Sequence, residues 1–411
     1  MGGAPILSIL LVINFATASM GMPLVGEDGK FAMSNLASIL FTMAGVVKYF
    51  NASQPINRDF VRIFLVFNVS CSVSFLIFLI RFGWDPNFLV LLFQDEQLIF
   101  CALLMWYARD NFQSFRRATH IGIYCSALVM VFYGIRDLRA GDIMYAFGMD
   151  DKSQASVLIC CEAYILARFY GSKIDCVLSV VLLAASFFTL SRLPVFFVPA
   201  IILAVWNSSR FGASLSIAVA IGSAGVLAVT SASITDIFIV FNRLSSVATV
   251  SGEASTASHL LLVKSGLYMK FSDVLAFVFG TGPGNFSKAL STYQAYMPEL
   301  QSVDPLLVAE ALKGKAPMHS TPVSLLLDWN IGLFLLCVYL LLKALRYLLQ
   351  ARLMLDLVFT LALVLASTFY SLHNKHYLFL VVAVVIIFIR TQVERGSHDD
   401  GIARLRACAL S

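Results

Sequence analysis

Residues 60–80, FVRIFLVFNVSCSVSFLIFLI, form a run of apolar side chains that carries a single charge, that of Arg62. A helix needs about 20 such residues to cross the hydrocarbon core of a bilayer. A helix also satisfies its backbone hydrogen bonds within itself, which lipid requires of any segment that crosses it. The run therefore predicts a membrane-spanning helix.

The rest of the chain has the same character. Hydrophobic residues make up 59% of the 411 residues and charged residues only 13%, and the mean hydropathy is +0.84. A soluble fold of this length cannot bury so much apolar surface. We therefore expect an all-α integral membrane protein of about twelve transmembrane helices. The expected spans are Pro5–Met20, Phe31–Tyr49, Phe60–Ile80, Phe88–Tyr107, His120–Ile135, Ala155–Phe169, Ile174–Leu190, Leu193–Trp206, Ala213–Ser231, Thr321–Leu342, Leu353–Ser371 and Tyr377–Ile389.

The positive charges predict the orientation of these helices. The net charge of +5 is spread over short loops, and Lys and Arg collect in cytoplasmic loops. Alternation of the basic loops places both termini in the cytoplasm. The expected organisation is helices 1–9 in residues 1–231, a periplasmic loop in 232–320, helices 10–12 in 321–391 and a cytoplasmic tail in 392–411. Dispersed charge of this kind is not typical of nucleic-acid binding, so no nucleic acid is expected as a partner.

The cysteines give no sign of a metal centre. There are eight, most of them inside apolar runs, with no CxxC pair and no zinc-ligand spacing. No metal is therefore expected.

The segment 232–320 is far longer than a connection needs, which favours a functional role. Its apolar stretch Leu260–Phe279 contains Lys264, Lys270 and Asp273. Because central charges are costly in lipid, we expect one or two interfacial helices here, not a further span. Two short helices are expected after it, one starting near Asn285 and one from Asp304-Pro305 to about Leu312.

A glycine-rich turn, GTGPGNF at residues 280–286, lies between these helices. A turn before a helix exposes backbone N–H groups where the helix dipole is positive, which suits a phosphate. On this interpretation Gly282, Gly284 and Asn285 bind substrate. The alternative is that the glycines make a tight turn that only anchors the loop.

Two further segments give the turn a specific context. Residues 280–286 resemble the glycine-rich signature in the large periplasmic loop of the O-antigen ligase/polymerase superfamily. Residues 318–333, MHSTPVSLLLDWNIGL, resemble the histidine segment that leads from that loop into the tenth span of this family. Ser191-Arg192 resembles the Ser-Arg pair at the start of its eighth span. The similarity covers residues 191–342, about a third of the chain.

The resemblance implies a GT-C-like membrane glycosyltransferase of the bacterial inner membrane with its active site facing the periplasm. Such an enzyme transfers a glycan from an undecaprenyl-pyrophosphate carrier to a sugar hydroxyl, with inversion and with no cofactor. The partners expected are the carrier-linked oligosaccharide donor, the glycan acceptor, membrane lipid, and flippase and chain-length regulator proteins.

The resemblance also assigns roles to residues. His319 is the expected catalytic base, and Arg192 is expected to bind the diphosphate, which a planar guanidinium can hold by two oxygens. The family commonly has Asn where this chain has Ser320. The family also has an arginine on a loop helix before the glycine turn, and this arginine is not obvious in the present sequence. Arg243, His259 or Lys264 could take the place of that arginine.

Several alternatives stay open. Polymerisation of lipid-linked repeat units is the first choice of function, and an O-antigen ligase acting on lipid A-core uses the same chemistry. A transporter or lipid-sugar flippase is the alternative from another class, although it would concentrate its polar groups within the spans. The carboxylates of Asp95, Glu96 and Glu162 within apolar runs either pair with a cation such as Arg168 or Arg192, or bind acceptor sugar.

Overall fold

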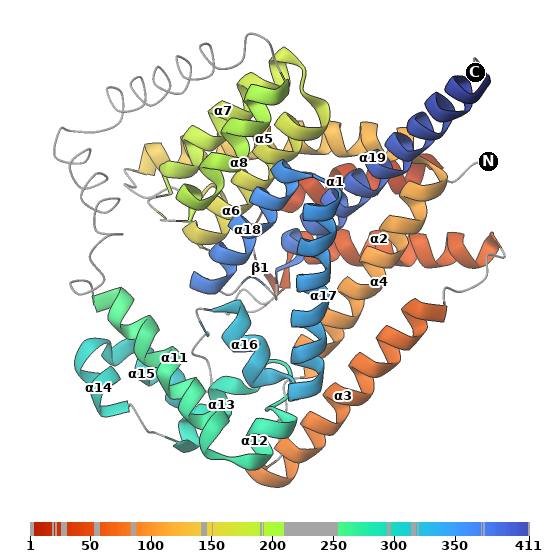
Figure 1. Ribbon diagram of the computed structural model, residues 1–411. Helices are drawn as coiled ribbons and strands as arrows, with labels where there is room; N and C mark the ends of the chain where they lie inside the picture. Colours follow the sequence, from red (N-terminus) through yellow and green to blue (C-terminus); the bar gives the residue numbers. More distant parts are fainter. Residues whose placement is uncertain are drawn as a thin grey trace.

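The computed structural model describes residues 4–18, 20, 23–25, 31–52, 58–83, 88–140, 146–149, 151–189, 191, 193–208, 254–293, 297–313, 318, 320–370, 372 and 375–409 (Figure 1). Apart from one two-stranded ribbon, its regular elements are helices. Before residue 250 they are α1 (Ala4–Ala18), β1 (Pro23–Val25), β2 (Phe31–Ala32), α2 (Met33–Asn51), α3 (Arg58–Phe82), α4 (Phe88–Asp110), α5 (Phe112–Ala140), α6 (Lys152–Ile165), the π-helix η1 (Leu166–Tyr170), α7 (Lys173–Phe187) and α8 (Pro194–Ser208). After it they are α11 (Ala254–Ser272), α12 (Val274–Phe279), α13 (Phe286–Tyr293), α14 (Met297–Val303), α15 (Pro305–Leu312), α16 (Thr321–Asp328), α17 (Ile331–Gln350), α18 (Met354–Phe369) and α19 (His376–Ala409).

Six of the described helices are long and apolar enough to cross a membrane, namely α2, α3, α4, α17 and the apolar parts of α5 and α19. Three shorter apolar helices lie within α1, α8 and α18. Large apolar side chains stand exposed along the spanning helices, for example Leu65, Val69 and Ile80 on α3. Water disfavours such a surface and lipid accepts it. These helices indicate a membrane protein, while the count of twelve spans stays a prediction.

One predicted span is interrupted, and the predicted tail has regular structure. The predicted tenth span, Thr321–Leu342, is divided into α16 and α17, because Trp329 is extended and Asn330 starts a new helix by accepting a hydrogen bond from the Leu333 N–H at 2.8 Å. The predicted tail is helical, since α19 continues to Ala409. The predicted span Ala213–Ser231 lies outside the described residues.

The loop helices fall close to where the sequence predicts them. The stretch 260–279 forms two helices, α11 and α12, separated at Asp273, whose carboxylate caps α12. The helices expected near Asn285 and from Pro305 to Leu312 are α13 and α15, and α14 between them was not predicted. Whether α11 and α12 lie on a membrane surface stays a prediction.

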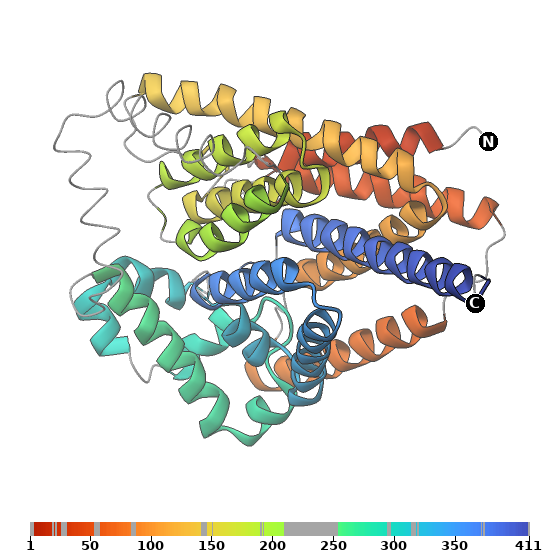
Figure 2. The same ribbon diagram turned by 45° about the horizontal axis from the view of Figure 1, so that its top comes forward.

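The described residues form two buried apolar clusters. The larger joins residues of α1, α2, α4 to α8, η1, α17, α18 and α19. The smaller includes Phe78 of α3, Met269 of α11, Leu290 of α13 and Leu327 of α16. Figures 1 and 2 show α11 to α15 gathered together, with α12 against the end of α3. The smaller cluster therefore fixes these loop helices to the spanning helix α3 and to the interrupted helix α16–α17.

Candidate functional site

The interruption between α16 and α17 is the centre of the candidate site. A helix end leaves carbonyl groups without partners inside the helix. The glycine turn supplies those partners, because the Thr281 N–H donates to the Leu327 carbonyl at 3.0 Å and the Gly282 N–H donates to the Asp328 carbonyl at 2.8 Å. Thus the turn and the interrupted helix form one hydrogen-bonded unit.

The carboxylate of Asp328 completes this unit. It is buried and accepts hydrogen bonds from the Gly284 N–H and from the Thr281 hydroxyl, each at 3.2 Å. The buried Asn285 closes the turn by donating from Nδ2 to the Thr281 carbonyl at 3.1 Å. One acidic side chain thereby holds the turn that starts α13.

A buried lysine lies on the other side of the same break. The Lys270 side chain on α11 is 0% exposed, and its Nζ donates to the Trp329 carbonyl at 3.2 Å. A cation at the C-terminal end of α16 is favoured by the helix dipole. Burial lowers the pKa of Lys270 to about 8 and raises the pKa of Asp328 to about 7. Both groups precede α17, one of the six candidate spanning helices.

Glycine is required where the turn meets the break. Gly280 has a φ of +72°, and a Cβ built there would lie 2.5 Å from the Trp329 carbonyl oxygen. Gly282 has a φ of +80°, and its Cβ would meet the ring of Phe75 at 3.2 Å. Only glycine adopts such conformations without strain and allows the backbones to approach so closely.

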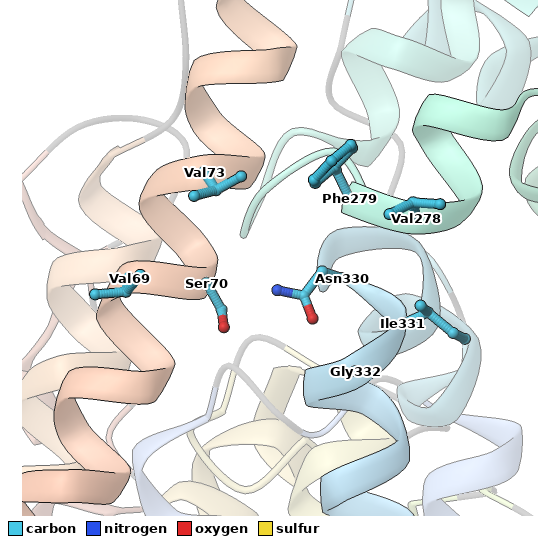
Figure 3. A pocket seen from close by; sticks show the side chains of 8 residues that line it. All are labelled: Val69, Ser70, Val73, Val278, Phe279, Asn330, Ile331 and Gly332. Carbon is cyan, nitrogen blue, oxygen red and sulfur yellow. The ribbon is translucent and has the colours of Figure 1, made fainter.

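A small cavity of about 260 Å³ opens beside this unit, between α3, α12 and the start of α17. Figure 3 shows Ser70 of α3 opposite Asn330, with Val73 and Phe279 near each other above them. Its walls are mainly apolar, and the Ser70 hydroxyl and the Asn330 amide are its polar groups. We assign it no ligand.

The structure gathers three predicted site residues and separates a fourth. Gly282, Gly284 and Asn285 lie together at Asp328. The Gly282 and Gly284 N–H groups already donate to Asp328, so a phosphate at the turn would have to replace those bonds. The anchoring alternative therefore fits this geometry better, and substrate binding by the turn stays a prediction. Lys264 is exposed on α11, in contrast to the buried Asn285 of the turn.

The other predicted site residues lie in parts of the chain that the structure does not describe. Arg192, Arg243 and His319 lie outside the described residues, as does the side chain of His259. Their roles stay predictions.

Described residues close in sequence to two of these candidates contact the C-terminal end of α18. Four positions after residue 192, the ring of Phe196 stacks on Phe369 with centroids 5.6 Å apart. Two positions after residue 319, the Thr321 hydroxyl donates to the Tyr370 carbonyl at 2.9 Å. Phe196 and Thr321 therefore contact consecutive residues of the fold.

Lys270 and Asp328 are the residues to which the sequence assigned no role. Asp328 stands inside the quoted segment 318–333, and an acidic residue within an apolar run is itself a signal. Lys270 was grouped with Lys264 as a charge in an apolar stretch, yet only Lys270 is buried.

The carboxylates within the apolar helices α4 and α6 do not make the expected ion pairs among the described residues. Arg168 binds Asp356 at 2.9 Å and not Glu162. Asp95 accepts from Asn68 at 2.9 Å. The contacts of Glu96 are hydrogen bonds to polar groups that include Thr42 at 2.8 Å. In the described ranges, no group of three or more His, Cys, Asp and Glu side chains could hold a metal ion.

The raised pKa of Asp328 predicts a pH-dependent stability. The folded protein keeps this proton up to about pH 7, whereas an unfolded aspartate loses it near pH 4. Because the unfolded chain then binds fewer protons, the free energy of unfolding should fall as the pH rises from about 4 to 7. Asp328→Asn should flatten that fall, as measured by denaturant unfolding in detergent. Glu310→Gln, at an exposed carboxylate, is the control. An unchanged slope in Asp328→Asn would contradict the assignment.

Comparisons with known proteins find no family model and no curated protein that matches the chain.

Proposed function

We propose that the chain is a membrane glycosyltransferase that polymerises undecaprenyl-pyrophosphate-linked oligosaccharide repeat units, for O-antigen or exopolysaccharide, at the periplasmic face of the bacterial inner membrane. The observation that carries the proposal is the docking of residues 280–286 on residues 318–333. These are the two segments with the strongest resemblance to the O-antigen ligase/polymerase superfamily. Thr281 and Asp328 join them across 47 positions of sequence.

The proposed reaction is a displacement at the anomeric carbon of the donor. The acceptor hydroxyl oxygen forms a bond to that carbon, and the bond from the carbon to the phosphate oxygen breaks. The electron pair leaves on the diphosphate, and the hydroxyl proton passes to His319. Arg192 neutralises the charge that grows on the diphosphate. The glycine turn, held by Asp328, fixes the segment that carries His319.

Purified protein tests the proposal directly. Liposomes containing the protein and carrier-linked repeat units should form glycan longer than one unit, in the presence of a chelator. Transfer to lipid A-core without chain growth would indicate the ligase alternative. Passage of the donor across the bilayer without a new glycosidic bond would indicate a transporter and would overturn the proposal.

Arg192 provides a second test. Its guanidinium can hold two diphosphate oxygens, whereas the lysine ammonium is a point charge, so both Arg192→Lys and Arg192→Ala should reduce polymer formation. Polymer length in cells is the measurement, at matched protein levels. Arg62→Lys, at an exposed arginine that pairs with the exposed Asp59, is the control. Normal polymer from both Arg192 variants would make the residue a membrane anchor.

A further inference from the structure

A buried polar network joins four helices away from the candidate site. It contains Asn14 of α1, Ser38 of α2, Glu96 and Gln97 of α4, and His376 at the start of α19. Asn14, Ser38 and Gln97 are 0% exposed and His376 is 2% exposed. Buried polar groups without partners are costly, so each donor and acceptor here has to be satisfied.

The ring of His376 lies between two amide groups. Its Nε2 is 2.8 Å from Asn14 Oδ1, and its Nδ1 is 2.7 Å from Gln97 Oε1. The orientation of Asn14 is fixed, because its Nδ2 donates to the Leu10 carbonyl at 2.8 Å and to the Ala37 carbonyl at 3.1 Å. Asn14 Oδ1 is therefore an acceptor, and Nε2 of the ring has to carry a proton.

The other side of the ring is linked to Glu96 through Gln97. Oε1 of Glu96 accepts from the hydroxyls of Ser38 and Thr42, each at 2.8 Å. Oε2 of Glu96 contacts Nε2 of Gln97. The amide of Gln97 thus has one end at a carboxyl oxygen and the other at a ring nitrogen.

Two arrangements of the protons and of the Gln97 amide satisfy every donor and acceptor between the ring and the carboxyl. If Glu96 is ionised, Gln97 Nε2 donates to it, Gln97 Oε1 faces Nδ1, and the ring has to carry two protons. If the ring is neutral, the amide of Gln97 is reversed so that its nitrogen donates to Nδ1. Its oxygen then faces Glu96, which has to be protonated. Each arrangement holds one proton more than a neutral ring beside an ionised carboxylate.

We propose that the buried His376 and Gln97 form a proton-binding site with the partly buried Glu96, in which one proton is shared between ring and carboxyl at neutral pH. The two groups titrate as a unit. Without this proton, the oxygen of the Gln97 amide faces another unprotonated acceptor. That acceptor is either Nδ1 of the His376 ring or Oε2 of Glu96. The bonds that hold the start of α19 to α1 and α4 then weaken. The site is independent of the proposed glycan transfer.

The other ionisable groups on the helices packed against α19 lie outside this network. The sequence of α1 contains none, and Lys48 lies in the last turn of α2. On α4, Asp95 binds Asn68, and the Cys101 thiol lies 3.8 Å from the Phe379 carbonyl. Glu162 of α6 makes no hydrogen bond to these residues. Within the described part of the chain, no second charged group therefore substitutes for Glu96.

Spectroscopy on the folded protein at pH 7 tests the site. Nitrogen NMR of labelled histidine reports the protonation of the ring, and infrared spectra report protonated carboxyl groups. The proposal expects either a doubly protonated His376, or a neutral ring with an acid band that disappears in Glu96→Gln and in His376→Gln. A neutral ring together with no such band overturns it. A neutral ring with an acid band that persists in Glu96→Gln and His376→Gln, or in the one of them that folds, also overturns the proposal.

Stability gives an independent measurement. Above about pH 7 the unfolded chain does not hold the shared proton, because its histidine is neutral and its glutamate ionised. The folding equilibrium constant should therefore fall roughly tenfold per pH unit from this site between pH 7 and 8. Glu96→Gln supplies an amide N–H in place of the acid O–H and should remove that dependence. Asp95→Asn, the adjacent carboxyl on α4, should retain it. Equal pH dependence of Glu96→Gln and wild type would overturn the proposal.

Discussion

His319→Ala is expected to reduce glycan transfer by about 100- to 10,000-fold, the usual contribution of a general base. An alanine cannot take the proton of the acceptor hydroxyl, and the hydroxyl is a poor nucleophile while it keeps that proton. The measurement is transfer by purified protein in liposomes with carrier-linked donor. The flanking residues Met318 and Ser320 are buried, and Thr321 is bonded to Tyr370. The substitution should therefore leave this part of the fold assembled.

Two controls separate catalysis from binding and folding. Binding of the carrier-linked donor should persist in His319→Ala, because the proposed diphosphate contact is Arg192. His259→Ala should cost less activity. Full transfer by His319→Ala would remove histidine from the mechanism and shift attention to Asp95, Glu96 or Glu162. Loss of donor binding would instead make His319 a substrate contact.

Gly280→Ala is expected to detach the glycine turn from the interrupted helix and to abolish transfer with it. The φ of +72° alone costs an alanine about 1 to 3 kcal/mol. The added Cβ would also lie 2.6 Å from the Asp328 carbonyl oxygen and 2.5 Å from that of Trp329. These are backbone atoms that no rotamer change can move. Hydrogen exchange of residues 280–285 and transfer activity should therefore change together.

Gly83→Ala is the matched control for this substitution. Gly83 has a φ of +81°, yet nothing lies within 4 Å of the Cβ that would be added. It also carries a positive-φ penalty for alanine, but without the collision. Near-normal activity in Gly83→Ala and loss in Gly280→Ala would assign the effect to the contact with the break. Equal behaviour of the two variants would contradict the docking.

The helices could largely be predicted from sequence because apolar runs and charges determine them locally. Phe60–Ile80 and Phe88–Tyr107 fall within α3 and α4. The break at Asp328–Asn330 was missed, since its neighbours are apolar and a hydropathy window averages over two polar residues. It depends on a contact with Thr281 that is distant in sequence.

The candidate site was only partly predictable for a similar reason. The glycine turn and the 318–333 segment could be identified from their motifs, but nothing in either shows that they bind each other. Lys264 and Lys270 look alike in the sequence, and only helix packing decides which of them is buried. The proton-binding site could not be predicted, because Asn14, Gln97 and His376 are distant in the sequence and none of them is unusual alone. Only the fold brings them into hydrogen-bond contact.

The interruption between α16 and α17 also bears on the order in which the chain assembles during synthesis. At 1.5 Å per residue, α16 is about 12 Å long and cannot cross a bilayer alone, whereas α17 is about 30 Å long. The ribosome completes the glycine turn before Asp328 is translated. The N–H groups of Thr281, Gly282 and Gly284 therefore have no carbonyl or carboxylate from the break to bind until the later segment emerges. Closure of the turn on the break consequently cannot precede the synthesis of Leu327 and Asp328, about 45 residues after the turn itself.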